Sequence, residues 1–569
     1  MKQASENGIL RIALAGSAVL LAFGIVVSTL YVVAVNFHPV VFRDSWETVP
    51  LFQAYLRGEP ILGRMWEPWY RHRIFFPRIL YLLDFRLAGG TGSLLVGASL
   101  LLQGGLAILV ALALRRQTGL SAWGRVLASS LAVCACFWLV QSGNLLWGFQ
   151  VAWFLNAFAA FLGAFLACGF RPEASRVEQG VRLACIGLCL ITATFSLANG
   201  ILIGVPLLAL LWKGGASRRV LLAGTIFWIV TAVIFFVGLG ASAGEGTAEA
   251  LYSTDSTLPQ KFLYVPVYLG NPFSRLHLGA GMALGAAGLG LFAVFCRRWF
   301  RSARPGFLES LAWAQMAYTV ATAAATAAGR SYFSIGQATS SRYYPPVLLF
   351  WLFAGLWGGL AIRKRATASR LAAAVFVGVS AILIAGQLAA VPERKERYLK
   401  ADNAALALAA GVDDTLALVY LQEHAGAELL RRMRELEPFL KERRLSIYRD
   451  RWLRTLGEEP GAAYRIGKAG ALRLTALEES PRGSAAEAGA GRFVSGVIEP
   501  VAGANSRERL LLVENGRVTG FAATRARACA GCFSGYASGP GSGPLAVYAL
   551  REGDGDGVVA WPVEASLSP

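Results

Sequence analysis

The sequence predicts an α-helical polytopic membrane protein with about eleven transmembrane helices, followed by a soluble domain that combines helices with a β-sandwich or barrel. Of its 569 residues, 55% are hydrophobic and only 16% are charged, which is too little charge for a soluble surface of this size. Apolar runs of about 20 residues, long enough to cross a bilayer, recur up to residue 391. The composition becomes that of a soluble protein over 392–569. We therefore expect a membrane domain over 1–391 and a soluble domain over 392–569.

Eleven apolar runs are the expected spans. The first, 12–35, is too long for a signal-peptide core and is followed by no obvious cleavage site, so we expect a retained anchor. The pair of runs around Asn199 is short and could form two half-spans or a tight hairpin. The ten later spans are expected at approximately 92–114, 122–140, 150–169, 181–196, 198–212, 220–240, 276–296, 307–329, 344–362 and 371–391.

Basic residues predict the orientation of these spans. Lys and Arg concentrate in cytoplasmic loops, and every even-numbered span is followed by a basic cluster, at 115–116, 171–176, 213–219, 297–304 and 363–370. We therefore expect a cytoplasmic amino terminus, and an odd number of spans then places the C-terminal domain on the outer side. In this interpretation the basic residues behind the net charge of +19 fix the orientation of the spans in the membrane. We therefore expect no nucleic-acid partner.

The first outer loop, 37–90, breaks this charge rule because it contains seven arginines, and the outer loop between spans nine and ten adds two more. An anionic ligand at the membrane surface is the simplest explanation, since a guanidinium donates two parallel hydrogen bonds to phosphate. The alternative is ion pairing with acidic residues of the loop and with lipid headgroups. Many aromatic residues in the same loop predict interfacial helices. The acidic residues are Asp44, Glu47, Glu59, Glu67 and Asp84.

The middles of the spans between residues 89 and 390 contain no Asp, Glu, Lys, Arg or His. Ion-coupled transporters place such groups near the bilayer midplane. Their absence disfavours a pump or symporter and favours chemistry at the outer face. The outer loop over 241–275 is long enough to cover a lipid groove, or forms a simple cap.

Four short segments resemble the GT-C glycosyltransferases, a superfamily of multi-span membrane enzymes. Phe42-Arg43-Asp44-Ser45-Trp46-Glu47 follows the first span and puts an acid just past the membrane, although Ser45 stands where the superfamily pattern has a second acid. The others are His72-Arg73-Ile74-Phe75-Phe76-Pro77-Arg78, Gly143-Asn144-Leu145-Leu146-Trp147-Gly148-Phe149-Gln150, and the stretch from Gly329-Arg330 to Ser341-Arg342-Tyr343.

The resemblance implies an enzyme of the bacterial inner membrane, with its C-terminal domain periplasmic. Such an enzyme moves a sugar from a polyprenyl-phosphate donor to a hydroxyl of a cell-surface glycan, a lipid-linked saccharide or an exported protein. It also implies that Asp44 is the catalytic base. Because phosphate leaves as a stable anion, one carboxylate and several cations are a sufficient catalytic set. We expect no cofactor and no metal site, and the sequence leaves a requirement for a divalent cation open.

Other acids and bases of the first outer loop are weaker candidates for catalysis. Glu67 is the second candidate for the base and His72 the third, although a lone histidine between arginines is more often a surface hydrogen-bonding residue. Asp44 and Glu47 also have the spacing of a helix capping box, with Asp44 as the N-cap.

Five arginines are the candidates for binding the donor phosphate. For each of them, snorkelling to lipid headgroups is the alternative role. In order of preference they are Arg71, Arg73 and Arg342, followed by Arg330 and Arg78.

Two other function classes stay open, namely a lipid-linked glycan translocase and a non-catalytic membrane protein that binds glycans. In the soluble domain we expect helices over 394–455 and strands over 462–569. Cys529 and Cys532 are expected to form a local disulfide. The strands visible in the sequence lie at 509–513, 518–521, 545–548 and 558–561.

Overall fold

The computed structural model describes the chain in two compact units. The first comprises Met1–Phe37, Ala54–Leu82 and Leu94–Arg394, and the second comprises His38–Gln53, Leu83–Ser93 and Lys395–Pro569. The expected loop 37–90 is thus divided between them. Described residues are 2–569 except 118, 240–256, 275–276, 363–367, 422–426, 469–471, 483–488, 500–507, 525–530, 542, 553–557 and 566–569.

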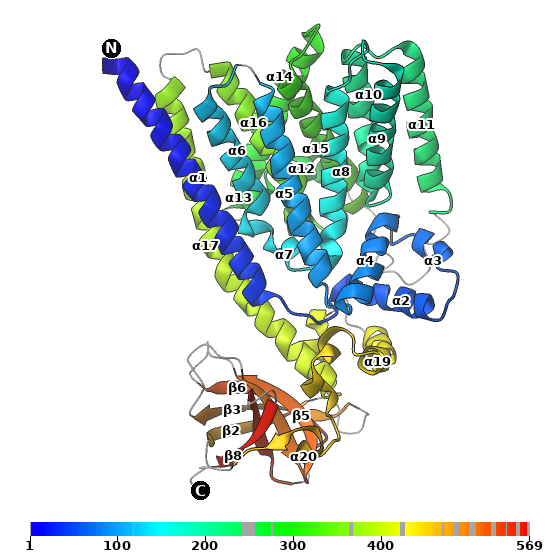
Figure 1. Cartoon of the computed structure of the whole chain (residues 1–569), viewed down its shortest axis with the longest axis vertical. Helices are drawn as coiled ribbons and strands as arrows, with labels where there is room; N and C mark the ends of the chain where they lie inside the picture. The colour runs from blue at the N-terminus through cyan, green and yellow to red at the C-terminus, as the bar shows by residue number, and fades with distance from the viewer. Residues whose placement is uncertain are drawn as a thin grey trace. The chain divides into compact units, whose positions relative to one another are not determined.

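The first unit is a bundle of long helices joined by short helical segments (Figure 1). The last of them, α17, continues beyond Arg394 into the second unit. The helices are α1 (Lys2–Asn36), α3 (Leu62–Trp66), α4 (Phe75–Ala88), α5 (Ser93–Arg115), α6 (Ala122–Phe137), α7 (Ser142–Leu145), α8 (Val151–Cys168), α9 (Arg176–Thr194), α10 (Gly204–Lys213), α11 (Arg218–Phe236), α12 (Leu258–Leu269), α13 (Asn271–Ser274), α14 (Leu278–Arg301), α15 (Phe307–Arg330), α16 (Tyr344–Ile362) and α17 (Ala368–Ala409).

Short 3-10 helices connect several of these elements. They are η2 (Leu139–Gln141), η3 (Gly148–Gln150), η4 (Ala198–Ile203), η7 (Ile335–Thr339) and η8 (Ser341–Tyr343).

Eight helices in the described part of the chain are long and apolar enough to cross a membrane. The predicted helical fold with several apolar helices is thereby confirmed and agrees with a membrane protein, whereas the count of eleven spans is not confirmed. The other three expected spans also coincide with helical segments, namely η4 with α10, α15, and α16. Of these, the segment Ala198–Lys213 is apolar but shorter than the eight.

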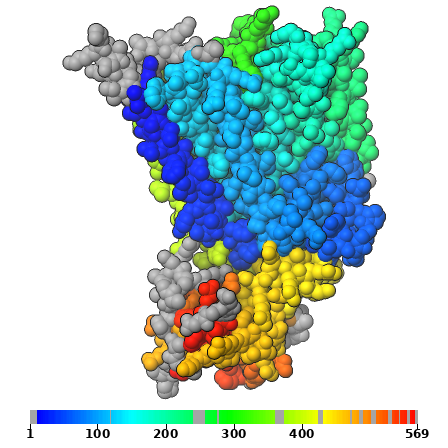
Figure 2. Space-filling model, viewed as in Figure 1, coloured from blue at the N-terminus to red at the C-terminus, as the bar shows by residue number. Residues whose placement is uncertain are grey.

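Large apolar side chains remain exposed on the outside of the bundle. Leu20 and Phe23 of α1 are 72% and 68% exposed, and Leu222 of α11 is 63% exposed. In water a protein with such an apolar surface would associate or aggregate, whereas in a bilayer the lipid chains contact this surface. The opposite face of α1 packs along α6. In Figure 2, α1 is the dark blue surface, and it lies beside the lighter blue surface of the helices that follow it.

Loops that the topology predicts to share a side come together in the first unit. Those expected outside are joined by the contacts Trp69–Phe149, Phe76–Phe195, Asn144–Ser341 and Asn271–Ser340. Those expected in the cytoplasm are joined by Lys213–Ser302 and Arg116–Phe307. The loops therefore group as an alternating arrangement of spans requires. Which group faces the cytoplasm stays a prediction.

The helical part of the second unit contains the end of α17, α18 (Thr415–Leu418) and α19 (Ala427–Glu442), together with η9 (Val419–Leu421), η10 (Ser446–Arg449) and η11 (Arg451–Arg454). It also contains η1 (Arg43–Glu47) and most of α2 (Thr48–Leu56). The described residues of 394–455, the range in which helices were expected, contain these helical segments.

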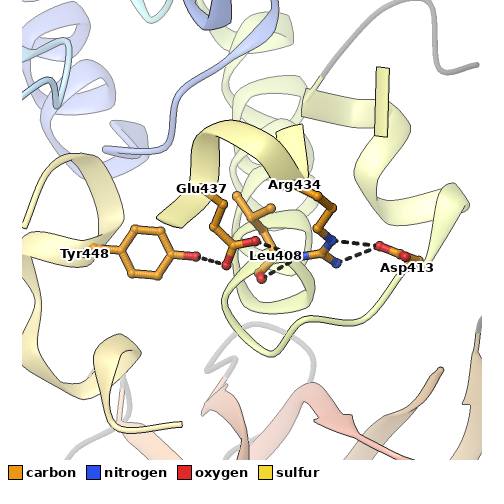
Figure 3. Close-up of polar contacts among 5 residues, drawn as sticks. All are labelled: Leu408, Asp413, Arg434, Glu437 and Tyr448. Carbon is orange, nitrogen blue, oxygen red and sulfur yellow. Dashed lines mark hydrogen bonds and ion pairs between the residues drawn. The ribbon is translucent and has the colours of Figure 1, made fainter. Parts of the chain in front are cut away.

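Arg434 of α19 is the centre of a polar network in this part (Figure 3). Its guanidinium donates to Asp413 at 2.7 and 2.9 Å, to Glu437 at 2.8 Å and to the carbonyl of Leu408 at 3.1 Å. The hydroxyl of Tyr448 in turn donates to Glu437 at 2.5 Å. The Arg434 side chain thus joins α19 to the end of α17 and to the turn that follows α17. Through Glu437 and Tyr448 the network also reaches η10.

The C-terminal part of the second unit is a closed β-barrel. Strands follow one another in the order β2-β3-β6-β5-β4-β7-β8, β8 pairs with β2 in parallel to close the barrel, and β1 adds to β8. Their bounds are β1 (Arg465–Ile466), β2 (Leu472–Arg482), β3 (Gly491–Glu499), β4 (Arg509–Glu514), β5 (Arg517–Thr524), β6 (Cys532–Ser538), β7 (Ala546–Glu552) and β8 (Val558–Ala565).

The barrel confirms the four strands that the sequence predicted and adds β1, β2, β3 and β6. Asn515 and Gly516 have φ angles of +52° and +76°, as a tight hairpin turn between β4 and β5 requires. Cys532 is disulfide-bonded, and the six other described cysteines are free. Cys529 lies outside the described residues.

Candidate anion-binding site

A two-residue hairpin in the first unit holds Arg71 and His72. The N–H of Trp69 donates to the carbonyl of His72 at 2.7 Å, and the reverse bond measures 2.8 Å. Tyr70, inside the turn, has a φ of +49°, a left-handed conformation that is uncommon for a large side chain. Such a conformation persists only where the surroundings enforce it, and it is frequent at ligand sites.

Three arginines from separate segments act on His72 through their positive charge. Arg71 comes from the hairpin, Arg330 from the last turn of α15 and Arg342 from η8. The pKa of His72 falls to about 3, because burial disfavours its charged form and because the positive charges of Arg330, Arg342 and Arg71 act on the ring. We call Arg71, Arg330 and Arg342 the arginine cluster.

Two asparagines fix the segment that holds Arg342. Asn144 donates to the carbonyl of Ser341 at 2.6 Å, and Asn271 donates to the carbonyl of Ser340 at 3.0 Å. The Nε of Arg342 donates to the Ser340 hydroxyl at 2.9 Å. Among the residues that the structure describes, no carboxylate forms an ion pair with Arg330 or Arg342. The segment that holds Arg342 is therefore anchored by hydrogen bonds, and the cluster is rich in positive charge.

Buried tyrosines adjoin the arginine cluster. The hydroxyls of Tyr264, Tyr268 and Tyr343 have no hydrogen-bond partner within the described part of the chain. Burial, followed by the neighbouring Tyr343, raises the pKa of Tyr264, whereas Arg330 and Arg342 lower it. The rings of Tyr268 and Tyr343 lie 4.6 Å apart. These hydroxyls are potential donors to an oxygen-rich ligand.

A second polar group lies next to Ala198, the residue whose backbone contacts His72. Asn199 of η4 donates to the hydroxyl of Tyr318 at 2.9 Å, and that hydroxyl donates to Asn156 at 2.6 Å. The neighbouring N–H of Ala198 donates to Nδ1 of His72 at 3.2 Å. The sequence analysis missed these residues, although the short pair of runs around Asn199 marked the segment as unusual.

Two of the five candidate arginines donate hydrogen bonds to backbone carbonyls. The buried guanidinium of Arg73 donates to the carbonyls of Phe235, at 2.9 Å, Trp66 and Val237, and stacks on the Trp66 ring. Arg78 donates to the carbonyls of Met65 and Glu67. Arg73 therefore satisfies carbonyls at the C-terminal end of α11, and neither arginine belongs to the cluster around His72.

Two further arginines of the first outer loop, 37–90, form ion pairs with an acidic residue of the same loop. Glu59 accepts from Arg57 at 2.5 Å and from Arg64 at 2.9 Å. Glu67 is exposed at the end of α3, and its backbone, not its carboxylate, contacts Arg78. The alternative explanation for the arginine-rich loop thus holds for Arg57 and Arg64.

Asp44 belongs to the second unit and lies half-buried in η1. The capping-box interpretation is wrong, because the N-cap of η1 is Phe42 without a side-chain bond, and Glu47 instead pairs with both terminal nitrogens of Arg432, one of them at 2.6 Å. Trp46 is only 1% exposed and anchors the turn. Arg43, beside Asp44, has a φ of +51°. Asp44 therefore lies in a turn that the buried Trp46 anchors.

The described residues contain no group of three or more His, Cys, Asp or Glu that could hold a metal ion. No protein-family model matches the chain, and the search of curated proteins finds no match. The proposal below therefore depends on the site itself and on the resemblance of the short segments.

Proposed function

We propose that this protein is a membrane glycosyltransferase of the GT-C type, which uses a polyprenyl-phosphate-linked sugar at the outer face of a bacterial inner membrane. The observation that supports this most is the arginine cluster around His72, at the end of the helical unit where the predicted outer loops meet. Guanidinium groups recognise phosphate oxygens with paired hydrogen bonds. A phosphate on a lipid would reach such a site from the bilayer.

The proposed reaction needs one base and one charged leaving-group site. The acceptor hydroxyl attacks the anomeric carbon of the donor sugar and gives its proton to a carboxylate, for which Asp44 is the candidate. The bond between that carbon and the phosphate oxygen breaks, and the polyprenyl phosphate departs with the electron pair. Positive charge stabilises the departing phosphate. The acceptor is a hydroxyl of a cell-surface glycan, a lipid-linked saccharide or an exported protein.

The test is a transfer assay with the full-length protein in nanodiscs, a radiolabelled polyprenyl-phosphate sugar and a mixture of envelope glycan acceptors. Asp44→Asn should lower transfer by about a hundredfold or more, the range that general base catalysis contributes. Donor binding should change by less than about twofold. The matched control is Glu59→Gln, a loop acid that pairs with exposed arginines, and it should transfer normally. Full activity of Asp44→Asn would exclude Asp44 as the base.

A lipid-linked glycan translocase is the second candidate. The observation that favours it is that the charges acting on His72 are all positive, so this site by itself supplies an anion-binding surface without a base. A translocase would move the lipid across vesicle membranes without releasing polyprenyl phosphate, and Asp44→Asn would leave that movement unchanged.

A further inference from the structure

We propose that His72 is an uncharged hydrogen-bond donor of the anion site, with its Nε2–H directed to an oxygen of the bound phosphate. This gives His72 a role in binding and excludes it as a base. The inference rests on the anion site of the proposed function, but it does not depend on sugar transfer.

The backbone determines which ring nitrogen carries the proton. The N–H of Ala198 donates to Nδ1 of His72 at 3.2 Å, so Nδ1 must offer a lone pair. A neutral imidazole has one acceptor and one donor nitrogen. The proton of His72 therefore resides on Nε2. The hairpin bonds between Trp69 and His72 hold the backbone of the ring in place.

The Nε2 donor is available to a ligand. It makes no hydrogen bond to any residue that the structure describes, and it is not among the polar atoms sealed from solvent. A partly buried donor without a partner loses hydrogen-bond energy unless a ligand or water satisfies it. Arg71, Arg330 and Arg342 are the charged groups that act on the ring, and their positive charge favours an anion beside it.

The arginine cluster also explains why the ring stays neutral. A fourth positive charge beside three guanidinium groups is repelled, and burial disfavours it further. The depressed pKa of His72 agrees with this geometry. A neutral donor adds a directed bond to an anion site without adding charge repulsion, which a lysine or a protonated histidine at this position would add.

Two measurements on the unaltered protein test the tautomer and the charge. Only four histidines are present, so ¹⁵N-histidine labelling resolves them, and the signal lost in His72→Asn identifies His72. The ¹⁵N signals of His72 should show a protonated Nε2 and an unprotonated Nδ1 from about pH 8 down to about pH 5. Sulfate keeps its charge over this range, and its affinity should change by less than about twofold. A histidine that titrates near its usual pKa would charge on acidification and bind sulfate about tenfold more tightly.

Substitutions test the hydrogen bond. His72→Asn keeps an acceptor near the position of Nδ1 but removes the donor, and the affinity for farnesyl phosphate should fall by about tenfold or more, as for other bonds to charged groups. His72→Gln places an amide N–H near the position of Nε2 and should restore the affinity to within about threefold of the original. His277→Asn, at the start of α14, is the matched control and should bind normally.

An imidazolium signal at pH 6, tighter sulfate binding in acid, or unchanged farnesyl phosphate binding by His72→Asn would each overturn the proposal. If His72→Asn does not fold, the signal lost in His72→Gln identifies His72, and the two measurements on the unaltered protein still decide. Failure of sugar transfer with normal sulfate binding and the expected tautomer would refute the glycosyltransferase and leave this inference standing.

Discussion

At the scale of single residues, arginines with the same sequence context take three different roles. Arg73 and Arg71 are two positions apart, yet Arg73 binds backbone carbonyls, whereas the charge of Arg71 acts on His72 together with those of Arg330 and Arg342. Arg57 pairs with Glu59 on the surface. The sequence could identify an excess of arginines but could not rank them, because the partner of each lies in a segment distant in the chain.

Arg73 is expected to stabilise the fold. Arg73→Gln leaves buried carbonyls at the end of α11 without donors, and each such loss costs about 1–3 kcal/mol. We expect the free energy of unfolding, measured by denaturation in mixed micelles, to fall by about 2–4 kcal/mol. The control is Arg57→Gln, whose side chain is 57% exposed, and it should change by less than about 0.5 kcal/mol. Equal stability of the two variants would contradict the role of Arg73 described above.

The pKa of His72 also predicts a pH dependence of stability. Its folded value of about 3 is below the ordinary value of 6.5, so the unfolded chain binds the proton more readily. This contribution to stability is fully present above pH 6.5 and is lost as the pH falls from 6.5 towards about 3. In thermal unfolding, His72→Gln should lose less stability than the original protein over the same acid range. Parallel pH profiles would show that His72 does not titrate as its surroundings require.

At the scale of elements, the sequence located helices and strands where local pattern suffices. The predicted helices over 394–455 and four barrel strands are present because apolar periodicity and turn residues such as Asn515-Gly516 are local signals. β2 and β3 were missed, since β2 carries the polar run Glu478-Glu479-Ser480-Pro481-Arg482, which hides the alternation of a strand. The capping box at Asp44 failed because Arg432, far away in sequence, takes Glu47.

The network around Arg434 should hold the helical part of the second unit together. Arg434→Met removes the partner of Asp413 and Glu437, which leaves two partly buried carboxylates without their cation (Figure 3). Breaking a buried ion pair on one side costs about 3–5 kcal/mol, and partial exposure reduces this to about 2–3 kcal/mol. Hydrogen exchange of α19 should therefore become faster.

The matched control for this network lies on the same helix. Arg431 pairs with Glu435 one turn along, and both side chains are more than half exposed. Arg431→Met should leave the exchange of α19 within about threefold of the original, since exposed pairs contribute little. Similar exchange in both variants would mean that the network does not stabilise α19.

At the scale of the whole molecule, composition predicted the membrane class and a change of character near residue 391, and the structure divides the chain at Arg394. The sequence could not show that His38–Gln53 and Leu83–Ser93 pack with the C-terminal residues. These segments follow and precede apolar spans, and only contacts such as Ser446 with Pro39 assign them to the second unit.

The predicted orientation is testable by labelling in intact cells. Pro60→Cys lies in an expected outer loop and Glu173→Cys in an expected cytoplasmic loop, and both original residues are exposed. A membrane-impermeant maleimide should label Pro60→Cys directly and Glu173→Cys only after permeabilisation, with the original protein giving the background of its free cysteines. The reverse pattern would invert the topology and place the arginine cluster in the cytoplasm.

The central claim is that Arg71, Arg330 and Arg342 bind the phosphate of a membrane lipid, and affinity for polyprenyl phosphate in nanodiscs tests it most directly. Arg330→Gln and Arg342→Gln should each weaken binding by about tenfold or more, the effect of losing a charge-assisted hydrogen bond. Arg57→Gln, from the arginine-rich first outer loop but paired with Glu59, should bind as the original protein does. Equal affinity in all four proteins would contradict the account.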